Sequence, residues 1–233
     1  MGGFGITRRM RRDWNQRARE NARHYVATGQ QQWSDEEFYR SGQLTVEEEI
    51  LNDLTNICGG KNPKQMRVLE IGCGAGRVTR ALAGFFGDVW AVDISPEMVR
   101  QARQTCVEFS NTHVLRNNGK DLRVVSNPWL VRLGLARPVA FDFAFSFMVF
   151  QHIPSQEIIE NYVREVHRLL RPGGLFKFQV QGSPLAEAEP GQTWVGVPFS
   201  ERDLREMAER CGFEMRYHNG AGSQYYWLWF FKR

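Results

Sequence analysis

The sequence predicts one α/β domain on a doubly wound, mostly parallel seven-stranded sheet, with an antiparallel strand pair at its C-terminal edge and an N-terminal helical cap. Two patterns support this fold class. Residues 1–60 have the period of helices, and from residue 67 short apolar runs alternate with helical stretches, which is typical of parallel βαβ crossovers. With 233 residues, the chain is long enough for one well-packed domain but short for two. We therefore divide it into a cap or lid of residues 1–60 and a Rossmann-like core of residues 61–233.

The cap is predicted to contain three helices. In the first, apolar residues recur at three- and four-residue steps over residues 10–25, and Gly29 can end it. Capping-box patterns at residues 34–37 and 45–48 each place an acid at the third helical position, where it can satisfy free amides. They predict that two further helices begin at Ser34 and Thr45.

The core is predicted to contain seven strands and one insertion. The strands cover residues 66–71, 88–92, 113–115, 141–147, 175–180, 213–218 and 224–231. The last two are separated by residues 219–223 alone, so they should form a hairpin. Residues 123–139 are predicted to be an insertion whose apolar face comes from Trp129, Leu130, Leu133 and Leu135.

Composition excludes several classes of protein. No apolar run approaches the roughly 20 residues that a membrane-spanning helix needs. The four cysteines form no Cys-x-x-Cys pair and the histidines no cluster, so we expect no metal site and no disulfide framework. The paired arginines near the N-terminus lack the apolar stretch of an export signal, which predicts a cytoplasmic protein. A net charge of +4 does not indicate a nucleic-acid partner, and we expect no membrane partner.

The most informative segment runs from Val68 to Gly76, where a buried strand leads into a Gly-rich turn and then a helix. Such a turn lets a ligand approach the backbone, and the helix N-terminus offers amides with partial positive charge. The next strand ends in Asp93, which can accept hydrogen bonds from ribose hydroxyls. More than one nucleotide-type ligand binds at such a turn. A dinucleotide is the weaker candidate, because its fingerprint requires a third glycine at position 77, where this sequence has Arg77.

The stretch from Glu70 to Gly76 resembles the first motif of class I S-adenosylmethionine-dependent methyltransferases, in particular the type 11-like, small-molecule branch. Further segments resemble that family in the correct order: residues 117–122, 141–153, 171–174 and 199–213. The resemblance covers roughly residues 64–231 and implies S-adenosylmethionine as cofactor. It implies that the cofactor-binding residues are Glu70, Gly72, Cys73, Gly74, Gly76, Asp93, Ile94, Met98, Asn118, Gly119, Ser146 and Phe147.

Methyl transfer from a sulfonium is an in-line displacement that alignment and desolvation accelerate, so a base is needed only when the acceptor must lose a proton. His152 is the best candidate for a catalytic base because it follows the fourth strand, whose C-terminal end should face the ligand. A purely positional role for His152 stays open. An Asn127-Pro128-Trp129 motif is a weaker candidate for a reaction centre, because a second proline is missing.

Acceptor specificity should reside outside the common core. The N-terminal helices resemble the lid of many family members, and residues 182–199 offer a second wall. From these segments, Tyr25, Trp33, Tyr39 and Trp194 are candidate substrate-binding residues. Aromatic walls indicate an apolar or aromatic small acceptor.

We therefore expect methyl transfer to a small-molecule acceptor. One alternative is methylation of a nucleic acid or protein, with the arginines of the first helix holding phosphates, because residues 1–23 carry seven arginines and two acids. A nicotinamide-dependent oxidoreductase and a non-catalytic cofactor- or partner-binding domain are alternatives from other classes. The oligomeric state is not predicted.

Overall fold

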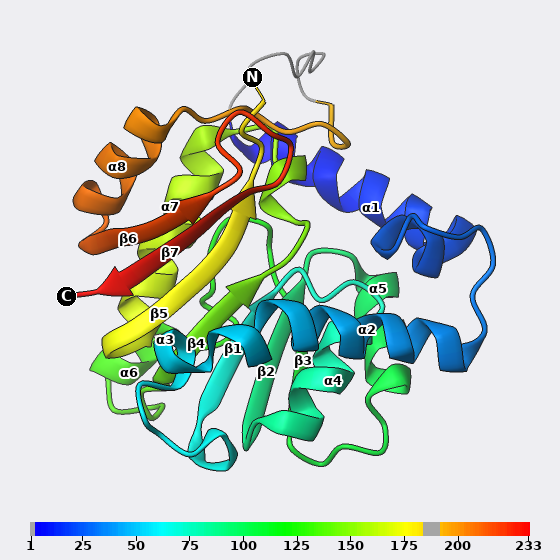
Figure 1. The fold of residues 1–233 in the computed structure, drawn as a ribbon, viewed down its shortest axis with the longest axis horizontal. Coiled ribbons are helices and arrows are strands. Elements are labelled where there is room, and N and C mark those ends of the chain that lie inside the picture. Colours follow the sequence, from blue (N-terminus) through cyan, green and yellow to red (C-terminus); the bar gives the residue numbers. More distant parts are fainter. Residues whose placement is uncertain (1–2, 184–191) are drawn as a thin grey trace.

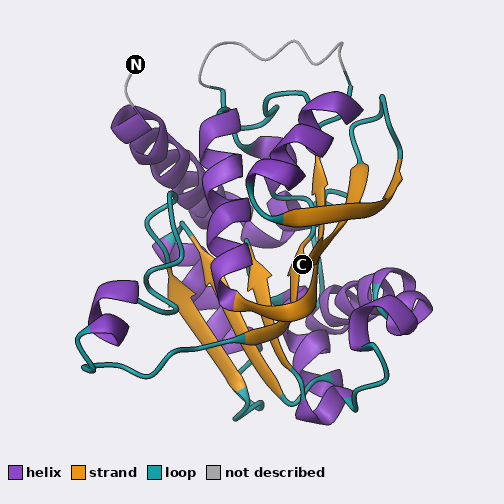
Figure 2. Ribbon diagram, turned by 90° about the vertical axis from the view of Figure 1, so that its left-hand side faces the viewer, coloured by secondary structure: helices purple, strands orange, loops and turns teal. Residues whose placement is uncertain are grey.

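The computed structural model describes residues 3–183 and 192–233, which form one central sheet with helices on both faces (Figures 1 and 2). The strand order is β3-β2-β1-β4-β5-β7-β6. The strands are β1 (Arg67–Ile71), β2 (Asp88–Asp93), β3 (Thr112–Arg116), β4 (Phe141–Ser146), β5 (Leu170–Val180), β6 (Phe213–Asn219) and β7 (Tyr226–Lys232). Strands β1 to β5 pair in parallel, whereas β7 is antiparallel to both β5 and β6. The predicted fold class is confirmed.

Eight α-helices in the described residues surround this sheet. They are α1 (Gly3–Val26), α2 (Asp35–Glu49), α3 (Leu54–Cys58), α4 (Arg77–Phe85), α5 (Pro96–Thr105), α6 (Pro128–Arg132), α7 (Gln156–Leu169) and α8 (Glu201–Arg210). Among these described residues, no helix combines the length and apolarity required to cross a bilayer. Residues 184–191, part of the segment predicted to form a second wall, lie outside the described residues.

The cap differs in one respect from its prediction. The capping box at Ser34 is present, since the Ser34 hydroxyl accepts from the Glu37 amide at 3.2 Å and the Glu37 carboxylate accepts from the Ser34 amide at 3.0 Å. The predicted helix start at Thr45 is wrong, because α2 continues through this residue. The Thr45 hydroxyl donates to the Ser41 carbonyl at 3.1 Å, which keeps it within the helix instead of at a new terminus.

Helix α2 packs tightly on α4 because it carries a glycine at the contact. A Cβ atom at Gly42 would lie 2.0 Å from the Arg77 carbonyl oxygen, so any other residue would push the two helices apart. From the same helix, Val46 joins Val68 and Phe143 in one buried cluster. The second half of the predicted cap therefore shares a hydrophobic core with the sheet, which draws most of its stability from such burial.

Helix α1 crosses the C-terminal ends of the strands (Figure 1). Met10 is buried in the main core, and Ala18 and Ala22 pack against Met98 of α5. Near its end the helix is interrupted at Asn21, whose φ of −167° and ψ of 83° are not helical. The side chain of Asn21 accepts from the His24 amide at 3.2 Å and restarts the last turn. This interruption turns the end of α1 toward the Gly-rich turn.

Candidate cofactor and acceptor site

A pocket lies at the carboxyl ends of β1, β2 and β4, beneath α1. Strand order reverses between β1 and β4, and in open α/β sheets ligands bind at such a switch point. Of the predicted site residues, the lining includes Tyr25, Glu70, Gly72, Cys73, Gly74, Asp93, Ile94, Met98, Phe147, His152 and Trp194. The topology thus brings eleven of the predicted residues to one place.

The Gly-rich turn is held open by its backbone conformation. After β1, the amides of Gly72 and Cys73 both donate to the Val92 carbonyl, at 2.7 and 3.1 Å. Gly74 has a φ of +51°, which L side chains adopt only with strain. A Cβ atom at this position would also lie 2.4 Å from Cγ1 of Val26 at the end of α1. Gly74 is therefore required both for the turn and for the close approach of the cap.

Asp93 at the end of β2 stabilises the Gly-rich turn through hydrogen bonds to its backbone. Its two carboxylate oxygens accept from the Gly74 amide at 3.0 Å and from the Ser95 amide at 2.8 Å. Each oxygen keeps a second lone pair, which can accept a hydroxyl. Burial raises the pKa of Asp93 to about 6, against the lowering effect of the backbone amides, so the group is ionised at neutral pH.

Glu70 is the second acid of the pocket and is almost fully buried. Its carboxylate accepts from the Thr79 hydroxyl, and Arg77 supplies a nearby positive charge. Burial nevertheless raises the pKa of Glu70 to about 7, with a further contribution from the Asp93 charge. A buried carboxyl group with a pKa near 7 is present in both protonation states at neutral pH. The ionised form can accept a hydrogen bond from an ammonium group, and the protonated form can donate one to a carboxylate.

The loop after β4 also lines the pocket. Met148 is the one residue other than glycine with positive φ among the described residues, at 57°. Its amide donates to the buried side chain of Gln179 at 2.9 Å, which stabilises this strained turn. Phe147 thereby faces the pocket, whereas the Ser146 hydroxyl turns inward and donates to the Ile71 carbonyl at 2.9 Å.

His152 is buried beside this loop with a defined tautomer. Its Nδ1 lies within hydrogen-bond distance of the Trp194 carbonyl, so Nδ1 must carry the proton and Nε2 the lone pair. Burial lowers the pKa of His152 to about 4, and the positive charge of Arg17 adds to this effect. The imidazole is therefore neutral at physiological pH, and its Nε2 can accept a hydrogen bond.

Gln151 adds a polar group that the sequence did not reveal as a site residue. It is 1% exposed, lines the pocket, and its Nε2 lies 3.5 Å from Nε2 of His152. Because that nitrogen of His152 is an acceptor, the amide group of Gln151 faces it and its Oε1 points elsewhere. This Oε1 is buried and has no hydrogen-bond partner among the described residues. Leaving such an atom unpaired costs about 1–3 kcal/mol, which a bound ligand can recover.

Aromatic rings cover the pocket between α1 and the segment before α8. Trp194 lies 6.2 Å from Trp14 and 5.9 Å from Tyr25, measured between ring centroids. The Arg17 guanidinium lies 4.7 Å from the ring of Trp14 and 5.2 Å from that of Trp194. Arg17 also donates to the carbonyl and the hydroxyl of Thr193, at 3.2 and 3.1 Å. These contacts fix α1 over the pocket.

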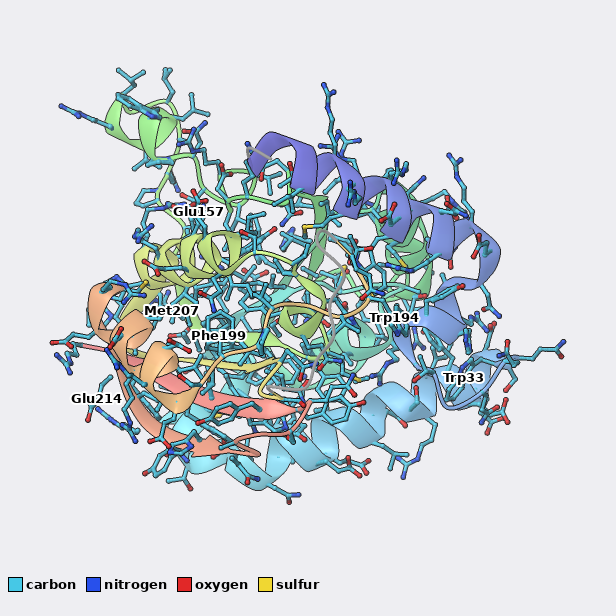
Figure 3. All side chains as sticks on the ribbon, turned by 90° about the horizontal axis from the view of Figure 1, so that it is seen from above. Trp33, Glu157, Trp194, Phe199, Met207 and Glu214 are labelled. Atoms are coloured by element: carbon cyan, nitrogen blue, oxygen red, sulfur yellow. The ribbon has the colours of Figure 1, made fainter. Side chains whose placement is uncertain are left out.

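Six predicted site residues lie outside the lining. Gly76 has a φ of 88° and caps the N-terminus of α4, and Gly119 packs against Ile94. The Asn118 side chain caps its own turn by accepting from the amides of residues 120 and 121. Ser146 is described above. Trp33 lies beyond the end of α1 in Figure 3. Trp33 and Tyr39 both pack against Phe38, with ring centroids 6.2 and 6.4 Å from it.

Next to Asn118, a different asparagine faces the pocket. Asn117 is buried in the lining, and its side-chain amide donates to the Tyr162 hydroxyl at 2.7 Å. Trp14 also lines the pocket, although in the sequence it is one member of an apolar helix face. Nothing in the sequence separates Trp14 from the core residues of α1, whereas Asn117 differs from the predicted residue by one position. Among the described residues, no group of three His, Cys, Asp or Glu side chains is placed to bind a metal ion.

Comparison with known proteins agrees with this architecture. A family model described as a methyltransferase domain matches residues 43–218, more than half of the chain. The ubiquinone biosynthesis O-methyltransferase of Xanthomonas campestris pv. campestris (strain B100) is 34% identical over 123 residues, which is 52% of this chain and 46% of that protein. The chain thus spans about half the length of the curated relatives it matches.

Solved structures share the fold at low sequence identity. The magnesium protoporphyrin IX methyltransferase (ChlM) of Synechocystis PCC 6803 with bound SAH has a TM-score of 0.66 and 20% identity, covering 96% of this chain and 98% of that chain. The N-methyltransferase NodS of Bradyrhizobium japonicum WM9, in complex with S-adenosyl-L-homocysteine, has a TM-score of 0.63 and 14% identity over 96% of this chain and 98% of that chain. Together with the family model, the Gly-rich turn and the strand order, these findings show that the chain belongs to the class I S-adenosylmethionine-dependent methyltransferases.

Proposed function

We propose that this protein transfers the methyl group of S-adenosylmethionine to a small-molecule acceptor. The observation that carries the proposal is the arrangement at the switch point, where ionised Asp93 fastens the open turn at Gly74 and keeps lone pairs free. The cofactor supplies an electrophilic methyl group on a sulfonium, whose departure as a neutral thioether needs no acid. The residues of this chain have to bind the cofactor and the acceptor, align the two reacting atoms and exclude water. Such alignment corresponds to effective molarities worth roughly 7–11 kcal/mol.

The pocket divides into a cofactor part and an acceptor part. Asp93 would accept from the ribose hydroxyls, and Ile94 and Met98 would flank the adenine. Because the glycines of the turn lack side chains, the ribose and methionine portions of the cofactor could approach the backbone there. Glu70 would accept a hydrogen bond from the ammonium group of the cofactor. Of the two asparagines, Asn117 has the better position for the adenine side, because it lines the pocket whereas Asn118 caps its own turn.

The acceptor part lies between the loop after β4 and the aromatic cover. Trp14, Tyr25 and Trp194 present apolar surface, and Gln151 Oε1 presents a hydrogen-bond acceptor. Nε2 of His152 becomes a second acceptor when a ligand replaces its 3.5 Å contact with the Gln151 amide. This combination favours a largely apolar acceptor that carries a hydroxyl or amino group. The Xanthomonas relative is an O-methyltransferase of ubiquinone biosynthesis, and transfer to oxygen would agree with a hydroxyl group on the acceptor.

His152 is proposed to bind the acceptor and orient its nucleophilic atom through Nε2, whose 3.5 Å contact with the Gln151 amide the acceptor would replace. With a pKa of about 4 it is a weak base, so proton removal by His152 would be coupled to attack instead of preceding it. A pH profile distinguishes these roles. If His152 titrates in catalysis, replacing it removes an inflection from the profile of rate against pH. If His152 only positions the acceptor, replacing it lowers the rate by the same factor at every pH.

The proposal is tested by incubating the purified protein with S-adenosylmethionine and pools of phenols, carboxylic acids and amines, and measuring release of S-adenosylhomocysteine. We expect one pool to raise this release, and the same pool to be inactive with Asp93→Ala. Release only with RNA or protein would favour a macromolecular acceptor. Tight binding of S-adenosylhomocysteine without turnover in any pool would favour a non-catalytic binding domain.

A further inference from the structure

The exposed apolar side chains of this protein are concentrated in one short segment. Of eleven large hydrophobic residues exposed in the described chain, five lie between residues 124 and 135: Val124, Trp129, Leu130, Leu133 and Leu135. Trp129 is 60% exposed, Leu133 67% and Leu135 73%. Single exposed apolar residues are ordinary, but a cluster of this kind marks a surface that contacts something else.

The backbone of this segment is folded so that these side chains project outward. The Asn127 side chain caps α6 by accepting from the Trp129 amide at 3.0 Å. The chain then closes on itself, because the amide of Leu133 donates to the Trp129 carbonyl at 3.0 Å and that of Leu135 to the Leu130 carbonyl at 2.8 Å. In Figure 3, α6, drawn in green, stands out from the body of the molecule with its side chains directed away from it. The segment is a built projection that buries none of these five side chains.

The same segment is positively charged. Residues 122–140 contain Arg123, Arg132 and Arg137 and no acidic residue. Beside it, Arg11 of α1 and Arg116 at the end of β3 line a shallow hollow together with Arg123, Val124, Asn117, Asn118 and Asp121. The one acid there, Asp121, lies 3.7 Å from Arg123. Apolar and basic groups therefore occupy one continuous surface.

Three kinds of partner can be compared on this chemistry. A nucleic acid would use the arginines but leave Trp129 and the leucines exposed. A second copy of the chain would cover the leucines, but a twofold interface places the same patch on both sides, so the arginines would face one another. An anionic lipid surface satisfies both groups, since indole and leucine side chains enter the boundary between headgroups and acyl chains while guanidinium groups remain at the phosphates.

We propose that residues 124–137 dock this protein peripherally on anionic lipid bilayers. Trp129, Leu133 and Leu135 enter the headgroup boundary, and Arg132 and Arg137 contact lipid phosphates. This differs from the expectation of no membrane partner, which rested on the lack of a spanning segment; a docking projection needs no such segment. The proposal is independent of the acceptor of methyl transfer.

The test is co-sedimentation of the full chain with vesicles of phosphatidylcholine alone and of phosphatidylcholine mixed with phosphatidylglycerol. We expect binding to the mixed vesicles that weakens at high sodium chloride. Replacing two arginines in R132Q/R137Q should lower the partition coefficient about twenty-five-fold, at about fivefold for each arginine. Removing two apolar side chains in W129S/L133S should lower it at least tenfold, even at low salt.

Two matched controls keep the result specific. R40Q/R202Q removes two exposed arginines from α2 and α8, and V107S/Y217S removes two exposed apolar side chains outside the segment; both should bind vesicles as the wild type does. Binding of S-adenosylhomocysteine reports that each variant is folded, because none of these residues lines the pocket. The proposal is overturned if the wild type ignores anionic vesicles, or if the segment variants bind as well as the controls. A dimer dissolved by W129S/L133S without vesicle binding would assign the surface to self-association, and an RNA shift lost in R132Q/R137Q would assign it to nucleic acid.

Discussion

Replacement of Asp93 by asparagine is the sharpest perturbation of the proposed cofactor site. In the wild type both carboxylate oxygens already accept backbone amides, and Asp93 lines the pocket. An amide keeps one acceptor oxygen and points an NH2 group at either Gly74 or Ser95. It thereby loses a charge-assisted bond, worth about 1.5–3 kcal/mol, and leaves a backbone amide without an acceptor. We expect the dissociation constant of S-adenosylhomocysteine to rise at least thirtyfold, or about 2 kcal/mol.

The pH dependence of the same binding supplies a second magnitude. Because burial raises the pKa of Asp93 to about 6, the ionised form that accepts hydroxyls falls from about nine tenths near pH 7 to about one tenth near pH 5. If only that form binds, the dissociation constant rises about tenfold over this range. Glu70, with a pKa of about 7, titrates in the same range, so the contribution of Asp93 is the part that disappears in Asp93→Asn.

Isothermal titration calorimetry with S-adenosylhomocysteine measures both effects. The matched control is Asp88→Asn, which removes a carboxylate from the other end of β2, where it pairs with Arg67 at 2.5 Å and lies away from the pocket. The control should bind as the wild type does, and thermal melting should show both variants folded. A dissociation constant for Asp93→Asn within threefold of the wild type at neutral pH would refute the reasoning.

Three further variants test the turn, the imidazole and the cover. Gly74→Ala should lower the affinity for S-adenosylhomocysteine at least tenfold, because positive φ costs about 1–2 kcal/mol and the added Cβ would lie 2.4 Å from Val26. Adding Val26→Ala should restore part of the affinity, and a double variant without any rescue would contradict a clash between residues 74 and 26. Because the pKa of His152 is lowered in the folded state, the unfolded chain binds a proton at this residue more readily. The free energy of unfolding of the wild type should therefore fall by about 3 kcal/mol as pH falls from about 6.5 through about 4, and urea titrations of His152→Gln should lack that loss. Equal losses in both proteins would contradict burial of His152 as the cause. Arg17→Met removes a cation–π contact worth about 2 kcal/mol. Stopped-flow fluorescence should therefore show S-adenosylhomocysteine leaving faster, by up to about thirtyfold, and an unchanged rate would argue against α1 as a cover.

What the sequence predicted correctly depends on local rules. Six of the strands lie within about two residues of their predicted bounds because their apolar runs are bounded by Gly, Pro, Asn and Asp residues. Strand β5 instead begins at Leu170, five residues before its predicted start, and continues through Pro172 and Gly173. The turn at Gly72 to Gly76 was found because positive φ restricts its composition. The start at Thr45 failed because a capping box is also compatible with a helix interior. In the structure the Thr45 hydroxyl donates to the Ser41 carbonyl, and α2 continues to Glu49.

The remaining site residues could not be predicted because tertiary placement defines them. Trp14 belongs to an ordinary amphipathic pattern, and only the path of α1 across the strand ends turns it toward the pocket. Gln151 becomes a site residue because the Trp194 carbonyl, 43 positions later, fixes the tautomer of His152. Asn117 and Asn118 are equivalent in the sequence, and the turn after β3 decides which one faces inward.

Transfer of an isotope-labelled methyl group tests the central claim most directly. The protein is incubated with S-adenosylmethionine that carries a deuterated methyl group and with a total cell extract, and mass spectrometry then follows the label in the small-molecule, RNA and protein fractions. The proposed function predicts label in a small, largely apolar molecule with a hydroxyl or amino group, and none with Asp93→Asn. Label confined to RNA or protein, or label transfer that persists in Asp93→Asn, would contradict it.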